Sequence, residues 1–180
     1  MLKTLRKIVA VGIVSEPLPP SDALLRVRAA LDRRVARLLG RALCIRHVDA
    51  GSCNGCELEI QALGNPYYNL EGGNIRFVAS PRHADLLLVT GPVVRNMAAA
   101  LRATYAATPA PKLVVALGDC GCDGGIFGAH GECLGPVARV IPVDVAVPGC
   151  PPDPVRILQG ILTAIDSTSA QAAAEARDAP

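Results

Sequence analysis

Two cysteines three positions apart are the first residues in this chain that could perform metal chemistry. Cys53 and Cys56 flank Asn54 and Gly55 and follow directly on an apolar run. Three residues span close to one helical turn, so a helix beginning near Asn54 would place both thiolates at its positively polarised N-terminal end, where an anionic metal–thiolate site is favoured. A single Cys-x-x-Cys pair also occurs in zinc knuckles and thioredoxin-like redox proteins. The remaining ligands must therefore come from elsewhere in the chain.

The cysteine count indicates metal ligands rather than a disulfide framework. Seven cysteines among 180 residues is an odd number, and the chain has no convincing export signal. Residues 1–14 resemble a basic and a short apolar signal region, but residues 15–17 (Ser-Glu-Pro) form a poor cleavage site and no twin-arginine motif precedes them. We therefore expect a reducing, cytoplasmic compartment.

Composition excludes several classes of protein. Half of the chain (51%) is apolar, yet no run approaches the roughly 20 apolar residues of a membrane-spanning helix. Aromatic residues make up only 3%, too few for a platform on which nucleic-acid bases stack, so we expect no nucleic-acid partner. The glycine-rich stretch 118–131 contains neither a GxGxxG motif nor a P-loop lysine, and no serine, histidine and acid set suggests hydrolysis.

Strands and helices are predicted to alternate along the middle of the chain. The apolar runs in the expected strands are unbroken by polar residues, which indicates a parallel sheet covered on both faces. We therefore predict an α/β fold, an open doubly wound, mostly parallel sheet of the flavodoxin-like kind. The expected strands are residues 43–48, 75–79, 85–90, 113–117 and 143–147, and the expected helices are residues 57–63, 93–107 and 154–165.

The two ends of the chain are predicted to flank this domain, which spans residues 42–165. Residues 1–41 form an N-terminal extension, in which residues 21–41 repeat apolar side chains with helical spacing. Residues 166–180 contain no large apolar residue and are predicted to be a flexible tail. The predicted N-terminal helix is basic on its other face, which is either solvated or a docking surface for a partner subunit or anionic lipid head groups. Its basic residues are Arg26, Arg28, Arg33, Arg34, Arg37 and Arg41, against Asp22 and Asp32.

Four of the cysteines follow predicted strands. Cys53 and Cys56 come after the first strand, Cys120 after the fourth, and Cys150 after the fifth. The carboxyl ends of parallel strands lie on one edge of a sheet, where doubly wound folds bind their ligands. We therefore predict that these four thiols form one site.

The four thiols suit either zinc or an iron–sulfur cluster. Cys120 and Cys150 are delivered singly, 64 and 94 residues after Cys56. That spacing fits a paired zinc knuckle poorly and fits a cluster seated over a sheet edge better. Pro151 and Pro152 lack N–H groups and would form a stiff apolar wall beside the sulfur of Cys150. A zinc-stabilised scaffold without redox function remains the competing class.

The other candidate residues have simpler interpretations. Cys122 lies two positions from Cys120 and is the one rival ligand, although we interpret it as a bystander. Cys44 is interpreted as a buried structural thiol in a strand, and Cys133 as a loop thiol. Glu57 stands where a carboxylate favours the start of a helix, with a proton relay as the alternative role. His83 is expected to orient the turn before its strand, and Arg82 to be a surface charge that meets a partner.

Four motifs in order resemble a known family. The resemblance spans about residues 42–165, and the family joins the B subunit of complex I to the small subunits of membrane-linked, group 4 nickel–iron hydrogenases. The motifs are residues 51–57 (Gly-Ser-Cys-Asn-Gly-Cys-Glu), residues 80–92 (Ser-Pro-Arg-His-Ala-Asp-Leu-Leu-Leu-Val-Thr-Gly-Pro), residues 118–120 (Gly-Asp-Cys) with residues 124–127 (Gly-Gly-Ile-Phe), and residues 142–152 (Pro-Val-Asp-Val-Ala-Val-Pro-Gly-Cys-Pro-Pro).

The resemblance implies an electron-transfer subunit of an oxidoreductase that is not catalytic alone. It implies one proximal [4Fe-4S] cluster, bound by Cys53, Cys56, Cys120 and Cys150. It also implies a hydrogenase-type large subunit docked over the cluster, a ferredoxin-like iron–sulfur subunit, and membrane subunits that hold the chain peripherally on the cytoplasmic face of the cell membrane.

The first cysteine pair separates two branches of this family. Quinone-reducing members resemble Cys-Cys at this position, whereas hydrogenase-type members resemble Cys-x-x-Cys, as found here. We therefore favour the small subunit of a formate hydrogenlyase or hydrogenase-4, with the B subunit of a complex I-like NADH–quinone oxidoreductase as the alternative. One departure is residues 72–74 (Gly-Gly-Asn), where many relatives have Arg-Phe-Gly, so this surface loop is expected to meet a different partner.

Overall fold

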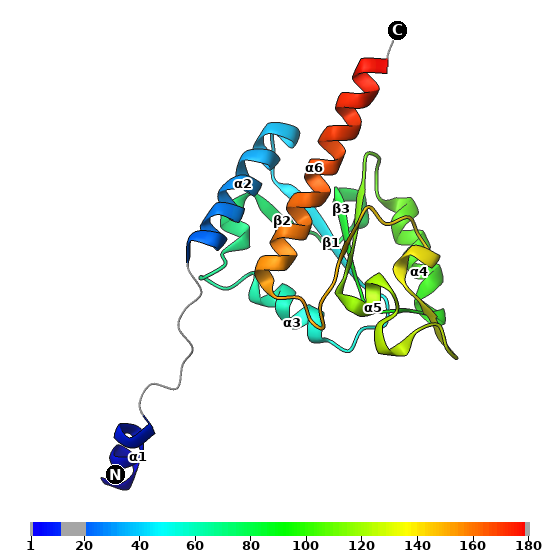
Figure 1. The fold of residues 1–180 in the computed structure, drawn as a ribbon. Coiled ribbons are helices and arrows are strands. Elements are labelled where there is room, and N and C mark those ends of the chain that lie inside the picture. The colour runs from blue at the N-terminus through cyan, green and yellow to red at the C-terminus, as the bar shows by residue number, and fades with distance from the viewer. Residues whose placement is uncertain (1, 12–20, 179–180) are drawn as a thin grey trace.

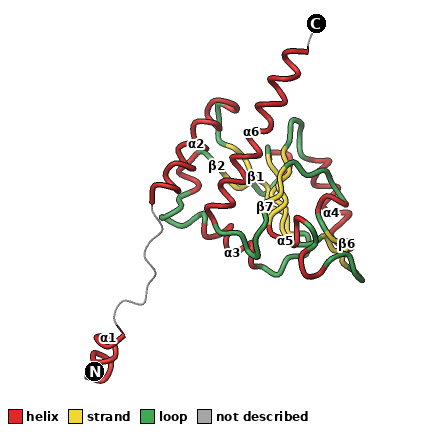
Figure 2. Tube along the Cα trace, in the orientation of Figure 1, coloured by secondary structure: helices red, strands yellow, loops and turns green. Residues whose placement is uncertain are grey.

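A five-stranded parallel sheet forms the centre of the molecule (Figures 1 and 2). The computed structural model describes residues 2–11 and 21–178. Every strand pair in this sheet is parallel, and the order is β2-β1-β3-β5-β7. Numbered along the chain this is the order 2-1-3-4-5 of flavodoxin-like sheets. The predicted fold class is confirmed. The strands are β1 (Leu43–Asp49), β2 (Ile75–Phe77), β3 (Leu86–Thr90), β5 (Leu113–Leu117) and β7 (Val145–Val147).

Alternate residues of the central strands feed two apolar cores, one on each face of the sheet. In β3, Leu86 and Leu88 belong to the first core, whereas Leu87 and Val89 belong to the second. This alternation follows from the two-residue period of a strand. Helices α2 (Ser21–Leu39), α3 (Gly55–Ala62) and α6 (Pro154–Asp178) cover the first face, and α4 (Arg95–Ala107) covers the second. The sheet is therefore covered on both faces, as its apolar runs predict.

A small antiparallel sheet shortens one predicted helix. Val93 and Val94 form β4, which pairs with β6 (Cys133–Gly135), so α4 begins only at Arg95 instead of at residue 93. The Arg95 N–H donates to the carbonyl of Glu132, which extends this contact by one residue. The loops between the main strands also contain four short 3₁₀ helices: η1 (Leu70–Gly73), η2 (Pro81–His83), η3 (Gly125–Phe127) and η4 (Val137–Arg139).

Both ends of the described chain are helical. The basic N-terminal stretch forms α2, whose Leu24, Leu31 and Val35 are buried in the first core. Helix α6 runs beyond residue 165, where the sequence predicts a flexible tail, and ends at Asp178. The Arg34 Nε lies 2.9 Å from the carboxylate of Asp166, which ties α2 to this part of α6.

The first helix, α1 (Leu2–Val11), precedes the undescribed residues 12–20. None of the helices in the described part of the chain combines the length and apolar character that a bilayer crossing requires.

Candidate metal centre

The carboxyl edge of the sheet carries a cavity of about 140 Å³ that four cysteines line. Cys53 lies in the loop after β1, and Cys56 lies in the first turn of α3. Cys120 lies in α5 (Gly118–Cys122), directly after β5, and Cys150 lies in the loop after β7. The structure thus brings together the four thiols that the strand positions single out. Cys56 and Cys120 are half-buried, whereas Cys53 and Cys150 are exposed at the mouth.

The loop after β1 has a shape fixed by hydrogen bonds. The Asp49 carboxylate accepts hydrogen bonds of 2.8 Å from the backbone N–H groups of Gly51 and Ser52. The Ser52 hydroxyl accepts a bond of 3.2 Å from the Asn54 N–H. Asn54 is left-handed, with φ of 74°, a conformation that asparagine tolerates better than most residues. Helix α3 then begins at Gly55, so Cys53 and Cys56 lie on either side of the helix start as predicted.

A reciprocal backbone contact joins the two loops that carry the single cysteines. The Asp119 carboxylate accepts a hydrogen bond of 2.7 Å from the Gly149 N–H, and the Asp119 N–H donates to the Gly149 carbonyl at 2.9 Å. Because Asp119 precedes Cys120 and Gly149 precedes Cys150, this pairing holds both thiols at the same end of β5 and β7.

Glycines keep space open beside two of the sulfurs. A β-carbon on Gly118 would stand 2.6 Å from the Cys56 sulfur, and one on Gly125 would stand 2.9 Å from the Cys120 sulfur. Contacts this short force a neighbour to move, so a larger residue at either position would crowd the cavity. The site therefore has the room that a bulky inorganic group requires, which is the role expected for this glycine-rich stretch.

The electrostatics of the site favour a cationic occupant. Burial raises the pKa of the Cys56 thiol to about 12, and the negative charges of Glu57 and the other three cysteines raise it further. Burial also raises the pKa of Cys120, together with the charges of Cys150 and Cys53. Four thiolates therefore need positive charge among them, which bound metal ions supply.

The spread of the donors distinguishes between a single ion and a cluster. Among the described residues, no three His, Cys, Asp or Glu side chains are placed to hold one metal ion. A zinc site requires all four sulfurs at about 2.3 Å from one point. Thiols that line one cavity without meeting at one point suit a polynuclear centre, in which each iron takes its own cysteine. The donor set thus fits an iron–sulfur cluster and counts against the zinc alternative.

The remaining cysteines lie outside the lining of this cavity. The Cys122 thiol donates toward the Ala116 carbonyl at 3.6 Å, and burial raises its pKa to about 11. Cys44 lies on β1 and Cys133 on β6, and the Cys44 sulfur is 3.7 Å from the Ala42 carbonyl. These positions agree with the interpretation of all three as bystanders, which stays a prediction.

A buried polar pair stands behind Cys56. Glu57 is only 8% exposed, and in the described structure neither of its carboxylate oxygens has a hydrogen-bond partner. The His47 Nε2 lies 3.5 Å from the Glu57 carboxylate and 2.9 Å from the Thr90 hydroxyl. Burial lowers the pKa of His47, an effect that the charge of Glu57 opposes. Sequence reasoning missed His47, although a histidine inside the otherwise apolar strand 43–48 was a usable signal.

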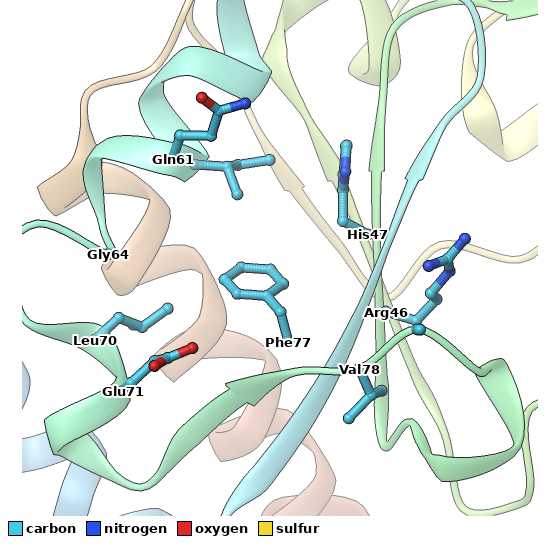
Figure 3. A pocket seen from close by; sticks show the side chains of 10 residues that line it. Arg46, His47, Gln61, Gly64, Leu70, Glu71, Phe77 and Val78 are labelled. Carbon is cyan, nitrogen blue, oxygen red and sulfur yellow. The ribbon is translucent and has the colours of Figure 1, made fainter.

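A separate cleft of about 430 Å³ opens on the other side of His47 (Figure 3). Gln61 and Gly64 come to it from the α3 side, Leu70 from η1, and Phe77 from β2. No cysteine lines this cleft, so we assign it no part in the metal centre. A third hollow, of about 520 Å³, includes Cys53, Cys120 and Cys150 and extends the site toward the exposed Ile126 and Phe127.

Comparison with known proteins identifies the family. Residues 53–164 match the family described as NADH ubiquinone oxidoreductase, 20 Kd subunit. The chain belongs to this family. The match contains all four cysteines that line the cavity, and the family implies an iron–sulfur cluster. The predicted resemblance is thereby confirmed.

Relatives come from both branches of the family. The chain is 45% identical to the probable membrane-bound hydrogenase subunit mbhJ of Pyrococcus furiosus, over 77% of this chain and 85% of the relative. It is 38% identical to formate hydrogenlyase subunit 7 of Escherichia coli, over 83% of this chain and 57% of the relative. It is 42% identical to the NADH-quinone oxidoreductase B subunit of Desulfovibrio desulfuricans, over 68% and 66% respectively. The chain is thus related to subunits of multisubunit oxidoreductases.

Solved structures agree on the fold. A chain of the archaeal membrane-bound sulfane sulfur reductase superimposes with a TM-score of 0.61 at 31% identity, over 79% of this chain and 74% of that chain. A chain of an NAD⁺-reducing [NiFe]-hydrogenase superimposes with a TM-score of 0.55 at 21% identity, over 68% and 92%. The second likeness supports the fold alone.

Proposed function

We propose that this chain is the electron-transfer subunit of a membrane-linked nickel–iron hydrogenase complex and carries one proximal [4Fe-4S] cluster. Its ligands would be Cys53, Cys56, Cys120 and Cys150. The observation that supports this best is that loops from three separate strands deliver these four thiols to one cavity of about 140 Å³.

In this proposal each residue at the sheet edge has a defined task. The four thiolates hold the iron atoms, and Gly118 and Gly125 leave space beside two of the sulfurs. Pro151 lines the same cavity and contributes apolar surface without an N–H group. The bound cluster supplies one-electron transfer. Because a single cluster performs no substrate chemistry by itself, the catalytic site belongs to a partner subunit.

The spacing of the first cysteine pair supports the hydrogenase branch. Helix α3 begins at Gly55, so Cys53 and Cys56 can reach one cluster from either side of a helix start. Adjacent cysteines directed at one cluster would require a more distorted backbone. The similarity to mbhJ and to formate hydrogenlyase subunit 7 points in the same direction.

The surroundings of the site suggest where the partners bind. A hydrogenase-type large subunit would cover the hollow beside Cys53, Cys120 and Cys150, where Ile126 and Phe127 are exposed. A ferredoxin-like iron–sulfur subunit and membrane subunits would complete a complex held on the cytoplasmic face of the membrane. Because Arg34 and Arg41 form ion pairs within the chain, the exposed Arg33 and Arg37 are the stronger candidates for contacts of the basic helix α2 with a partner.

Metal analysis of the purified chain tests the cofactor. We expect about four iron atoms and four acid-labile sulfides per chain, broad visible absorption, and an electron paramagnetic resonance signal after reduction. A chain that contains one zinc ion, without visible absorption, would instead be the non-redox scaffold.

The assembled complex tests the reaction. Hydrogen uptake or evolution with an artificial dye is the expected activity, together with nickel in the large subunit. Quinone reduction without hydrogenase activity, and a large subunit without nickel, would instead identify the B subunit of a complex I-like enzyme. The likeness to the sulfane sulfur reductase supports a second candidate. Reduction of polysulfide by the reduced dye, without hydrogen turnover, would favour that candidate over the hydrogenase.

A further inference from the structure

Helix α1 exposes an apolar face that no part of the described chain covers. Leu2, Leu5 and Val9 are 80%, 56% and 81% exposed, and none of them belongs to either apolar core. At about 100° per residue, these three side chains fall within roughly 60° of one another around the helix axis. Three large apolar side chains therefore form a single stripe along the helix.

The charges of α1 lie beside this stripe and have one sign. Lys3, Arg6 and Lys7 are all exposed, and the helix contains no acidic residue. By the same helical geometry, the three cations occupy an arc of roughly 100° that adjoins the apolar stripe. Long basic side chains in this position can keep their charges in water while their stems follow an apolar surface. The helix is thus amphipathic, with a wholly basic polar face.

We propose that α1 is an interfacial anchor that lies flat on an anionic lipid surface. A stripe of Leu2, Leu5 and Val9 matches the shallow apolar layer below the head groups, and three adjoining cations match the negative charge of those head groups. The helix has 10 residues, too few to cross a bilayer, so it lies on the membrane. This anchor is independent of the metal centre, because α1 contributes no residue to the site.

A tryptophan placed in the apolar stripe tests the proposal directly. The natural sequence contains no tryptophan, so Leu5→Trp provides a single reporter in the full-length, cluster-loaded chain. With vesicles of phosphatidylcholine and anionic phosphatidylglycerol mixed two to one, we expect a blue shift of its emission and quenching by lipids brominated on the upper acyl chain. The matched control is Leu25→Trp, at an exposed site on α2, which should show neither effect. No shift at position 5, or equal shifts at both positions, would overturn the proposal.

Vesicle cosedimentation of charge and stripe variants separates the two contributions. Leu5→Glu combined with Val9→Glu should reduce partitioning onto the anionic vesicles by more than tenfold. Lys3→Glu combined with Lys7→Glu should do the same, because each basic residue near an anionic surface contributes roughly fivefold. The control Arg33→Glu with Arg37→Glu makes the same change in net charge on α2 and should change binding by less than about threefold. Equal losses in both charge variants would contradict an anchor in α1.

The same reagents distinguish a lipid from a protein occupant. If the tryptophan of the Leu5→Trp chain shifts when the other subunits of the complex are added in detergent, and not with vesicles, the stripe binds a protein and the lipid proposal is wrong. Iron content and far-ultraviolet circular dichroism of each variant should match the unmodified chain, since α1 lies outside both cores. The outcome does not depend on hydrogenase activity.

Discussion

Gly118 packs directly against Cys56, so that a β-carbon on this glycine would stand 2.6 Å from the cysteine sulfur. The glycine also adopts φ of +81°, which places it in the left-handed region. The first residue after β5 thus sets the space available to a sulfur in the first turn of α3, and it joins two parts of the site that lie far apart in sequence.

We predict that Gly118→Ala lowers the iron content of the purified chain by at least half. The added methyl group must displace the Cys56 sulfur, whereas the left-handed backbone alone costs about 1 kcal/mol. The matched control is Gly131→Ala, since Gly131 has φ of +60° and no atom lies within 4 Å of the point where its β-carbon would stand. The control shares the backbone cost and should keep its iron. Equal iron loss in the two variants would show that backbone strain, and not the sulfur contact, limits cluster binding.

Serine substitution at each cysteine should divide the seven into two groups. We expect Cys53, Cys56, Cys120 and Cys150 each to lose most of the iron and the electron paramagnetic resonance signal, because each supplies one thiolate. Cys44→Ser, Cys122→Ser and Cys133→Ser should retain both, since these thiols lie outside the cavity lining. A variant set in which Cys122→Ser loses the cluster and Cys120→Ser retains it would assign that ligand to Cys122.

Much of this arrangement could be predicted because it depends on local patterns. The uninterrupted apolar run of β3 predicts a strand buried on both faces, and the sheet order places the ends of β1, β5 and β7 on one edge. Any thiol just beyond those ends must then face the same region. The start of α3 next to Asn54 was predictable for the same reason, since cysteine spacing and the following apolar residues are both local.

The features that could not be predicted depend on contacts between distant residues. Val93 and Val94 become strand β4 because β6, which lies beyond α4 and β5 in the chain, pairs with them, so the start of α4 is displaced. Arg34 and Arg41 look like part of a docking face in sequence, yet their partners Asp166 and Asp85 lie far along the chain. The contact of the histidine on β1 with the buried carboxylate of α3 likewise forms only when these two elements are placed side by side.

His47 should make the metal-free chain sensitive to mild acid. Burial lowers its pKa below 6.5, so the folded chain binds this proton less readily than the unfolded chain. Stability contributed by neutral His47 is therefore present above pH 6.5 and is lost as the pH falls below that value. Urea midpoints at pH 7.5, 6.0 and 5.0 should fall more steeply for the natural chain than for His47→Gln, which cannot be protonated. Parallel slopes for the two chains would show that Glu57 compensates the burial of His47 fully.

The ion pair between Arg41 and Asp85 should contribute to stability without affecting the cluster. The Arg41 guanidinium donates two hydrogen bonds, of 2.8 and 2.6 Å, to the Asp85 carboxylate, which is 16% exposed and also accepts a 3.0 Å bond from the Cys44 N–H. These contacts raise the pKa of Arg41, chiefly through the hydrogen bond to Asp85. Three donors would lose their acceptor in Asp85→Ala.

We predict that Asp85→Ala lowers the free energy of unfolding by about 2 kcal/mol, because charge-assisted bonds and a backbone N–H are lost together. The matched control is Glu132→Ala, which removes the exposed pair with Arg95 and should cost less than about 0.5 kcal/mol. Asp85 precedes β3, at the edge of the sheet opposite the cysteines, so iron content should stay unchanged in both variants. Urea unfolding and iron analysis measure the two effects separately. Loss of iron in Asp85→Ala at full stability would mean that this edge controls the metal centre, and equal costs for both variants would mean that the buried carboxylate contributes no more than a surface pair.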